Sequence, residues 1–263
     1  MQIYLPPGFD RDAATYLATL IDTAYDMCAQ WEAQQRPAAA DFHWTPQGPT
    51  LSYSAPVWGS CTLLAFFSRA EPFAYVAHSP DGLRGYVVFR GTQTPQDALS
   101  DLRAGLRDFS RVPAYGQAHE GFVEVYDTLS AALLAAVAAL PASVEQLWVC
   151  GHSMGSAFST LAIPDLLAHS RFGPAQLLHV NLASPRVAST AFAGAYAENG
   201  VQTYRVVNTC DLVPELPPAV LGEDLYQHVG IPVDFTLQRG SIDANHSARD
   251  SYRHALETAR ILT

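Results

Sequence analysis

Short apolar runs alternate with helical patterns along most of this chain, and this alternation restricts the possible folds more than any other feature. The strand-like runs cover residues 73–77, 85–89, 146–150, 176–182 and 203–207. Helical patterns, in which apolar residues recur at three- and four-residue steps, cover residues 10–35, 121–140, 154–169, 190–198 and 248–262. Strands that are apolar on both faces are typical of a parallel sheet covered by helices. The sequence therefore predicts an α/β fold with a mostly parallel central sheet and helices on both faces.

The other segments carry weaker signals. Residues 36–60 contain four prolines and are expected to wrap irregularly around the fold. The stretch Ser79-Pro80-Asp81-Gly82 is typical of a turn between two strands. Because no linker-like stretch or change of composition divides the chain, we expect one domain spanning residues 1–263.

The charged residues exclude several kinds of chemistry. The chain has 15 arginines and no lysine, so a Schiff-base enzyme, a P-loop and a Ser-Lys dyad are ruled out. The net charge of −10 repels phosphate backbones and anionic headgroups. We therefore expect no nucleic-acid partner, and any lipid contact must be made by apolar surface.

Cysteine and histidine spacing gives no sign of a metal or another cofactor. The four cysteines, at positions 28, 61, 150 and 210, form no CxxC pair and no zinc-type cluster, and no HExxH motif is present. Cys150 and Cys210 are expected to be buried and inert, and disulfide pairing stays open. The N-terminus lacks a signal-peptide pattern and the longest apolar run is too short to span a membrane. This favours the cytoplasm without excluding an extracellular location, and the oligomeric state is open.

A pentapeptide at the end of the third apolar run points to nucleophilic catalysis. Gly151-His152-Ser153-Met154-Gly155 fits the pattern G-x-S-x-G, placed between a buried strand and a helix. In that setting the serine occupies a strained turn that exposes its hydroxyl, and a side chain at either glycine would clash with the neighbouring strand or helix. The alternative is a helix N-terminus that Ser153 merely caps. We interpret Ser153 as a nucleophile.

A serine nucleophile needs a base and a group that orients the base. Among the acids after Ser153, Asp211 stands out because it follows the strand-like run 203–207. The histidines after Asp211 are His228, His246 and His254. His246 lies in a polar stretch predicted to be a loop before the last helix, His254 lies within that helix, and His228 lies on a strand-like run. We favour His246 as the base.

Several ordered segments resemble the class 3 lipases, the family of fungal triacylglycerol lipases and their relatives. They are Phe89-Arg90-Gly91-Thr92, His119-Glu120-Gly121-Phe122, the pentapeptide at 151–155, Ala183-Ser184-Pro185-Arg186-Val187, Asn208 to Pro214, and Tyr226-Gln227-His228-Val229-Gly230. The resemblance extends from about Tyr16 to the C-terminus. It implies the α/β-hydrolase fold and carboxylic-ester hydrolysis.

The resemblance also implies roles by position. Ser153 would be the nucleophile, Asp211 the orienting acid and His246 the base. The backbone N–H groups of Met154 and Thr92 would form the oxyanion hole. His152 is expected to line the site, His119 and His228 to be hydrogen-bonded structural residues, and Arg90 and Arg186 to form buried ion pairs.

Two departures from the family pattern affect the site. Met154 and Ser156 replace the usual leucine and glycine, and His246 precedes Tyr252 by six residues instead of five. One extra loop residue has a small free-energy cost.

Residues 93–118 raise the question of a lid. Leu99, Leu102, Leu106 and Phe109 lie on one helical stripe, and in the family the lid follows the oxyanion strand. Part of this segment is therefore a candidate lid, and the alternative is a permanently docked connecting helix.

The expected function is that of a lipase that cleaves acylglycerol esters through an acyl-enzyme. Alternatives within the family are a feruloyl-type or short-chain carboxylesterase and a phospholipase A1. A non-catalytic binding module with the same fold is the alternative from a different class.

Overall fold

The predicted strands lie side by side in one sheet, in a computed structural model that describes residues 1–61, 69–92 and 105–262. Across this sheet the order is β15 (Arg260–Ile261), β1 (Gln2–Ile3), β14 (Ile231–Phe235), β11 (Gln202–Asn208), β9 (Leu177–Leu182), β8 (Gln146–His152), β5 (Arg84–Phe89), β4 (Arg69–His78) and β2 (Ser52–Tyr53), with β3 (Val57–Cys61) also paired to β4. The middle of the sheet, from β5 to β14, is parallel, whereas β4 is antiparallel to β5. The prediction of a mostly parallel sheet is confirmed.

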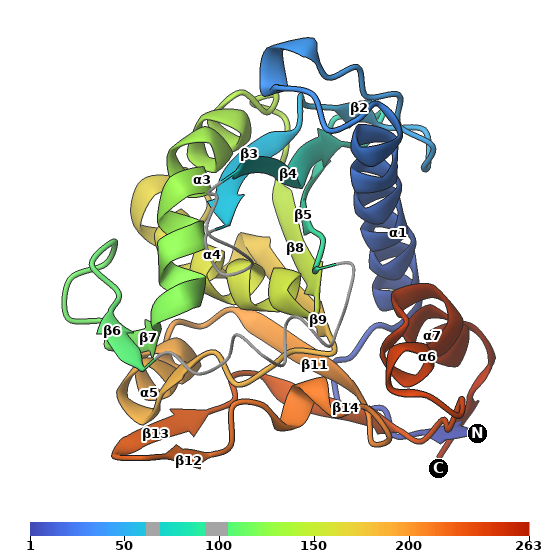
Figure 1. Ribbon diagram of the computed structural model, residues 1–263, viewed down its shortest axis with the longest axis vertical. Coiled ribbons are helices and arrows are strands. Elements are labelled where there is room, and N and C mark those ends of the chain that lie inside the picture. Colours follow the sequence, from blue (N-terminus) through green and yellow to red (C-terminus); the bar gives the residue numbers. More distant parts are fainter. Residues whose placement is uncertain (62–68, 93–104, 263) are drawn as a thin grey trace.

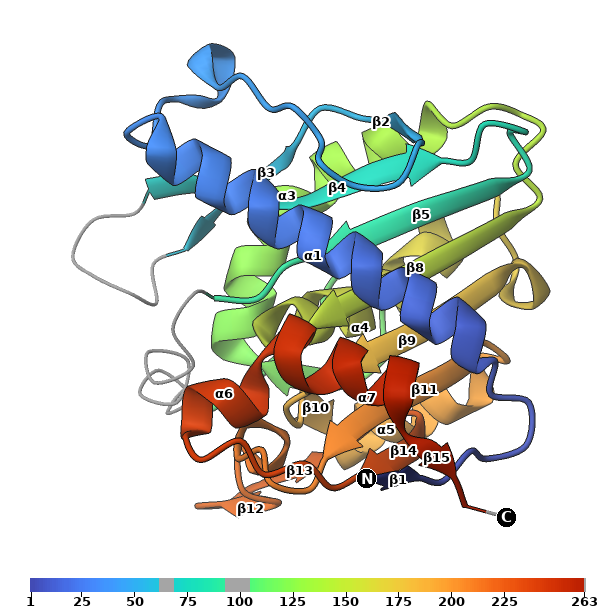
Figure 2. The same cartoon turned by 90° about the vertical axis from the view of Figure 1, so that its right-hand side faces the viewer.

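Helices cover both faces of this sheet (Figures 1 and 2). One face carries α1 (Arg11–Ala33), α6 (Ile242–His246) and α7 (His254–Thr258), and the other carries α3 (Glu120–Ala138), α4 (Met154–His169) and α5 (Thr190–Glu198). Side chains along β5 alternate between the two layers. Tyr86 and Val88 pack with α1, whereas Val87 and Phe89 pack with α3 and α4. This alternation explains why the sequence shows strands that are apolar throughout.

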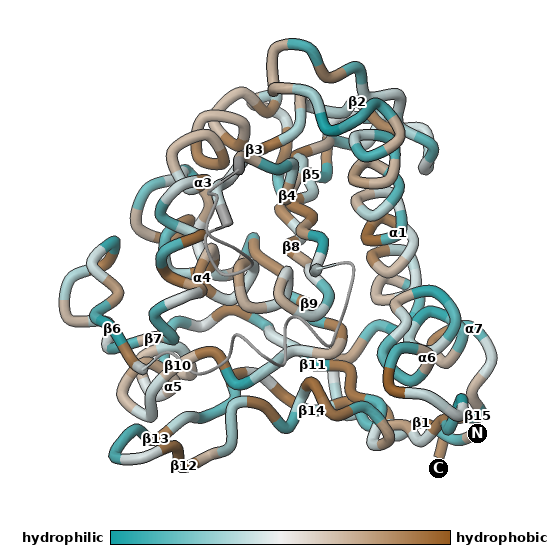
Figure 3. Tube along the Cα trace, in the orientation of Figure 1, coloured by the Kyte–Doolittle hydropathy of each residue, from teal (hydrophilic) through white to brown (hydrophobic). Residues whose placement is uncertain are grey.

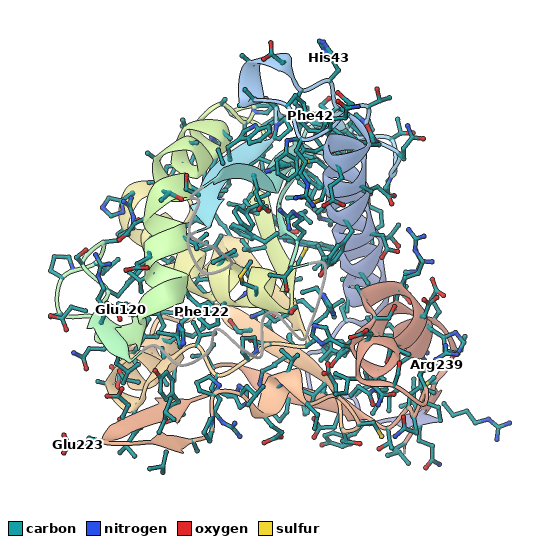
Figure 4. The ribbon with its side chains drawn as sticks, in the orientation of Figure 1. Phe42, His43, Glu120, Phe122, Glu223 and Arg239 are labelled. Carbon is teal, nitrogen blue, oxygen red and sulfur yellow. The ribbon has the colours of Figure 1, made fainter. Side chains whose placement is uncertain are left out.

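The hydrophobic stretches follow the centre of the sheet and hydrophilic residues mark the outer loops (Figure 3). At the periphery, His43 and Glu223 project away from the fold, Glu223 from the tip of a hairpin (Figure 4). Within the described residues, α3 is the helix that is long and apolar enough to cross a membrane. Its residues Phe122, Leu129 and Leu133 belong to the core against β3 and α4, as in a core helix of a globular fold.

A small antiparallel sheet lies beside the main one and corrects one expectation. Its order is β12 (Val220–Leu221), β13 (Asp224–Gln227), β10 (Ala188–Ser189), β7 (Gln117–His119) and β6 (Leu106–Asp108). Leu106 was expected on a helical stripe but pairs with His119 in the β6–β7 ladder. Phe109 is buried, with its ring 5.7 Å from that of Phe192. Residues 105–118 are therefore docked, and the rest of the candidate lid, 93–104, lies outside the described residues.

Two further segments differ from expectation. The region expected to be irregular, 36–60, contributes β2 and the start of β3. The expected last helix, 248–262, is divided into a π-helical turn (η4, Ala248–Arg253), α7 and β15, which pairs with β1. This pairing brings the two chain ends close together (Figure 1). Short 3₁₀ turns lie in three of the connecting loops: η1 (Ala39–Asp41), η2 (Pro174–Gln176) and η3 (Val213–Glu215).

Candidate active site

Ser153 joins β8 to α4 with a backbone conformation that is rare for any residue with a side chain. Its φ is 58° and its ψ is −128°. The Ser153 N–H donates to the Leu182 carbonyl of the neighbouring strand β9 at 3.0 Å. Non-glycine residues in such regions are strained by about 1–3 kcal/mol and occur where function needs the geometry. The turn therefore has the strained strand-to-helix form that the G-x-S-x-G pattern predicts.

The flanking glycines are required by close packing. A Cβ on Gly151 would overlap the Gly155 carbonyl of α4, and one on Gly155 would lie 2.5 Å from the Arg90 carbonyl. A Cβ on Gly91 would lie 2.7 Å from the Cβ of Ser153. The oxyanion-strand segment and the serine turn are therefore pressed together, which only glycine permits at these positions.

Ser156, where the family has glycine, is accommodated by hydrogen bonds. Its buried hydroxyl lies 2.8 Å from the carbonyl oxygens of both Gly151 and Leu182. Because both are acceptors on β8 and β9, the hydroxyl ties the start of α4 to the strand ends. The departure from the family pattern thus adds a contact to the turn.

Asp211, in the loop after β11, and His246, at the end of α6, lie side by side. The Nδ1 of His246 donates to Oδ2 of Asp211 at 2.7 Å, and both side chains are almost fully buried. Tyr252 donates its hydroxyl to the same oxygen at 2.6 Å, and the Val213 N–H donates to Oδ1 at 3.0 Å. With Nδ1 engaged, a neutral His246 presents Nε2 as an acceptor.

Burial alone would raise the pKa of Asp211, but its partners more than compensate. The hydrogen bond and charge of His246, together with the bonds from Tyr252 and Val213, lower the pKa below its usual value. Asp211 is therefore ionised in the neutral range, as a group that stabilises an imidazolium must be.

His246 ends the short helix α6, where the sequence predicted a loop. The side chain of Asn208, at the end of β11, donates to the carbonyls of Leu237 and Asn245 at 2.9 and 3.1 Å. Asn245 in turn donates to the Cys210 carbonyl at 2.9 Å. These bonds hold the His246 segment against the Asp211 loop. Nothing in the sequence pattern indicates this role for Asn208 or Asn245, because their partners lie far apart along the chain.

The extra residue between His246 and Tyr252 is absorbed by the π-helical turn η4. The N–H of Tyr252 donates to the Ser247 carbonyl five residues earlier at 3.2 Å. A π-turn holds one residue more than an α-helical turn, and such insertions are frequent at functional sites. Tyr252 consequently reaches Asp211 despite the altered spacing.

Ser153 Oγ and His246 Nε2 are both buried and have no hydrogen-bond partner in the described part of the chain. Catalytic hydrogen bonds often tighten only when substrate binds. His254 and His228, the alternatives for the base, lie elsewhere: His254 contacts Thr258 within α7, and His228 donates to the Pro214 carbonyl at 2.9 Å. Of the three, His246 is the one bonded to Asp211.

Thr92 and Met154 flank the serine turn. Met154 begins α4, where backbone N–H groups lack helical partners, and its side chain is buried in the core. Thr92 follows Gly91, whose carbonyl accepts from Nη1 of Arg90 at 2.8 Å. Since that carbonyl and the Thr92 N–H belong to one peptide group, Arg90 sets the direction of the N–H.

The two arginines predicted to form buried ion pairs differ. Arg90 is 2 % exposed and pairs with Glu71 at 2.7 Å, as expected. Arg186 pairs with Glu215 at 3.0 Å, but the Glu215 side chain is 70 % exposed, so this pair lies at the surface. Cys150 is fully buried, and burial raises the pKa of its thiol. Cys210 is only partly buried.

A cleft of about 400 Å³ lies beside His246. It is lined by Asp22, Tyr25, Asp26, Ala29, Thr92, His152, Asp243, His246, Ser247, Ala248 and Arg249. His152 lines it as the sequence predicted, with its ring 4.6 Å from that of His246. A larger hollow, about 740 Å³, lies at the β1–β15 edge of the sheet, but none of its lining residues belongs to the serine turn or the Asp211–His246 pair. Among the described residues, no group of histidines, cysteines and carboxylates is arranged to hold a metal ion.

Comparisons with known proteins agree with this geometry. The family model described as Lipase (class 3) matches residues 86–221, more than half of the chain. A lipase from Rhizopus niveus is 29 % identical over 197 residues, which cover 72 % of this chain and 45 % of that protein. A phospholipase A1 from Oryza sativa subsp. indica is 29 % identical over 211 residues, covering 64 % and 48 %.

Among solved structures, a triacylglycerol lipase whose catalytic centre is formed by a serine protease triad superposes with a TM-score of 0.67 at 25 % identity. The match covers 89 % of this chain and 83 % of that one. This chain spans about half the length of the curated relatives it matches. The fold is that of the α/β-hydrolases, and the chain belongs to the class 3 lipase family.

Proposed function

We propose that this chain hydrolyses carboxylic esters of lipids, with acylglycerols as the first candidate substrates. The observation that carries the proposal is the buried Asp211–His246 pair, packed against His152, the residue before the strained Ser153 turn. A serine hydroxyl is a poor nucleophile unless an oriented base removes its proton. This arrangement supplies both the base and the group that orients it.

The proposed reaction runs in two halves. His246 Nε2 takes the proton of Ser153 as its Oγ attacks the ester carbonyl, and Asp211 stabilises the imidazolium. The N–H groups of Thr92 and Met154 hold the oxyanion. His246 then protonates the leaving alcohol, and water repeats the sequence on the acyl-enzyme.

Ser153→Ala tests this proposal. Turnover of a soluble p-nitrophenyl ester should fall at least about 10³-fold, because the attacking group is removed. Ser159→Ala is the matched control, since Ser159 is another buried serine of α4 that bonds to Asn181 and His179 away from the turn. Near wild-type turnover in Ser153→Ala, with the fold intact by circular dichroism, would overturn the proposal.

Covalent labelling separates an enzyme from a binding module of the same fold. A fluorophosphonate should label the wild-type chain at Ser153 and leave Ser153→Ala unlabelled. Absence of labelling in the wild type would favour the non-catalytic alternative.

A phospholipase A1 is the second candidate, because a rice phospholipase A1 is among the relatives. The net charge of −10 disfavours anionic headgroups, so a neutral or zwitterionic lipid suits this chain better. A panel of triolein, phosphatidylcholine, phosphatidylglycerol, methyl ferulate and p-nitrophenyl esters of increasing length distinguishes the activities. Hydrolysis of triolein faster than the others supports a lipase, whereas the highest rate with methyl ferulate or a short-chain ester supports the esterase alternatives.

A further inference from the structure

The residue next to the nucleophile, His152, connects parts of the site that come from distant segments. Its Nδ1 lies 2.7 Å from the Tyr25 hydroxyl, which belongs to α1, and its Nε2 lies 2.8 Å from the His246 carbonyl. The Tyr25 hydroxyl also accepts from the Gly91 N–H at 3.1 Å. A continuous chain of hydrogen bonds therefore runs from the segment before Thr92 to the backbone that carries His246.

The direction of each hydrogen bond follows from simple chemistry. A carbonyl oxygen only accepts, so Nε2 of His152 must carry the proton that it donates to His246. A neutral imidazole has one N–H, so Nδ1 must accept and the Tyr25 hydroxyl must donate. The hydroxyl still has a lone pair for the Gly91 N–H. All the groups in the chain are therefore satisfied in one arrangement.

Burial keeps His152 in this neutral form. The side chain is 2 % exposed, and burial, with the nearby His246 adding to it, lowers the pKa of His152 to about 3. Burial also raises the pKa of the Tyr25 hydroxyl, so it stays protonated. The chain of bonds thus persists across the neutral range and does not shuttle protons.

We propose that Tyr25 and His152 are positioning residues that fix the distance between the oxyanion segment at Gly91–Thr92 and the base His246. This inference rests on the proposed function of Ser153 and His246. The two ends of this series of hydrogen bonds act on different parts of the reaction, since one end holds the oxyanion donor and the other holds the general base. A displacement of about 1 Å in such groups costs up to 100-fold in rate.

Tyr25→Phe tests the proposal, with Tyr75→Phe as its matched control. Tyr75 is a buried tyrosine whose hydroxyl donates to the Leu20 carbonyl at 2.9 Å, in the same layer of the core. We expect kcat for a soluble p-nitrophenyl ester to fall about tenfold in Tyr25→Phe with little change in KM. Both variants lose one buried hydroxyl, so both should lower the melting temperature by similar amounts. Only Tyr25→Phe should lower kcat, and Tyr75→Phe should leave kcat unchanged.

His152→Gln completes a double-mutant cycle. A glutamine amide nitrogen can take the place of Nε2 and keep the bond to His246 while the bond to Tyr25 is lost. The loss of kcat in Tyr25→Phe/His152→Gln should therefore be about that of the larger single loss. The proposal would be overturned if the loss of kcat in the double variant equalled the product of the two single losses. Equal kcat in Tyr25→Phe and Tyr75→Phe would also overturn it.

The tautomer of His152 gives a test that needs no variant. Nuclear magnetic resonance of the wild-type chain with labelled histidine should show His152 protonated at Nε2 alone, and protonation at Nδ1 would overturn the inference. These outcomes are distinct from failure of the proposed function. If Ser153→Ala keeps its activity, the function is wrong, whereas loss of activity in Ser153→Ala with unchanged kcat in Tyr25→Phe refutes only the positioning role.

Discussion

The peptide group between Gly91 and Thr92 is held on the side opposite to the proposed oxyanion. Arg90 donates from Nε to the Pro72 carbonyl, from Nη1 to the Gly91 carbonyl and from Nη2 to Glu71. A planar guanidinium presents these donors in a fixed fork that lysine cannot reproduce. Arg90 thus fixes the orientation of the Thr92 N–H from a buried position.

We expect Arg90→Lys to lower kcat about tenfold. This is less than the loss of about 10²–10³-fold in kcat that follows complete removal of an oxyanion donor. The measurement is steady-state hydrolysis of a p-nitrophenyl ester. Arg84→Lys is the control, because Arg84 lies at the opposite end of β5, away from Gly91 and Thr92. There the Cζ of Arg84 lies 3.9 Å from the centroid of the Trp148 ring. Equal kcat in the two variants would contradict the role assigned to Arg90.

The strained backbone of Ser153 predicts an opposition between stability and activity. Ser153→Ala removes the hydroxyl but keeps a Cβ in the strained conformation, whereas Ser153→Gly removes both. Relief of about 1–3 kcal/mol of strain exceeds the about 0.5–1 kcal/mol entropic cost of a glycine. Ser153→Gly should therefore be more stable than Ser153→Ala by about 1 kcal/mol in urea unfolding, and a less stable glycine variant would show that the turn is relaxed.

Asp165 of α4 anchors the segment between β6 and β7. Its side chain is fully buried and accepts from Arg111 Nε and the Tyr126 hydroxyl, each at 2.9 Å, while His169 lies at 2.8 Å. A buried carboxylate that loses its cationic partner is strongly destabilising. This ion pair therefore fastens the segment around Arg111 to α4.

Arg111→Met should lower the free energy of unfolding by about 2 kcal/mol, less than the full cost because Tyr126 and His169 remain. In the Asp165→Asn background the same change should cost much less, since no charge is left unpaired. Urea unfolding of the four proteins measures the coupling. Equal effects of Arg111→Met in both backgrounds would contradict this account.

Long periodic segments and ordered motifs could be predicted from the sequence, and short non-local pairings could not. The sequence pointed to Asp211 and His246, and the structure brings their side chains to hydrogen-bonding distance. β6 and β7 have three residues each, too few for an alternating pattern, so Leu106 and Phe109 suggested a helix. Tyr25 lies in the helical pattern of α1, where nothing local indicates a hydrogen bond to His152 on β8.

Buried neutral histidines couple the stability of the fold to pH. His179 is fully buried between the Tyr196 hydroxyl, at 2.6 Å, and Ser159 Oγ, at 3.0 Å. Burial lowers the pKa of His179, like that of His152, to about 3. In the unfolded chain a histidine has a pKa of about 6.5. Between these values the unfolded chain binds more protons, so stability falls as the pH falls below about 6.5.

Each such histidine contributes a slope of about 1.4 kcal/mol per pH unit. His179→Gln should therefore show a shallower decline of the free energy of unfolding between pH 6 and pH 4 than the wild type, by about that slope. The comparison between variants cancels the changing repulsion among the acidic side chains, which both proteins share. Parallel curves would show that His179 is protonated in the folded state.

The two halves of the candidate site have supports of unequal strength. Thr92 and Ser153 follow neighbouring parallel strands in the middle of the main sheet, whereas His246 lies on the five-residue helix α6. On slow heating, His246, the proposed base, should therefore be displaced before the sheet melts. Thermal inactivation would then precede the calorimetric transition and be reversible on cooling, because Ser153 and the parallel strands beside it stay in place and His246 can pack against them again.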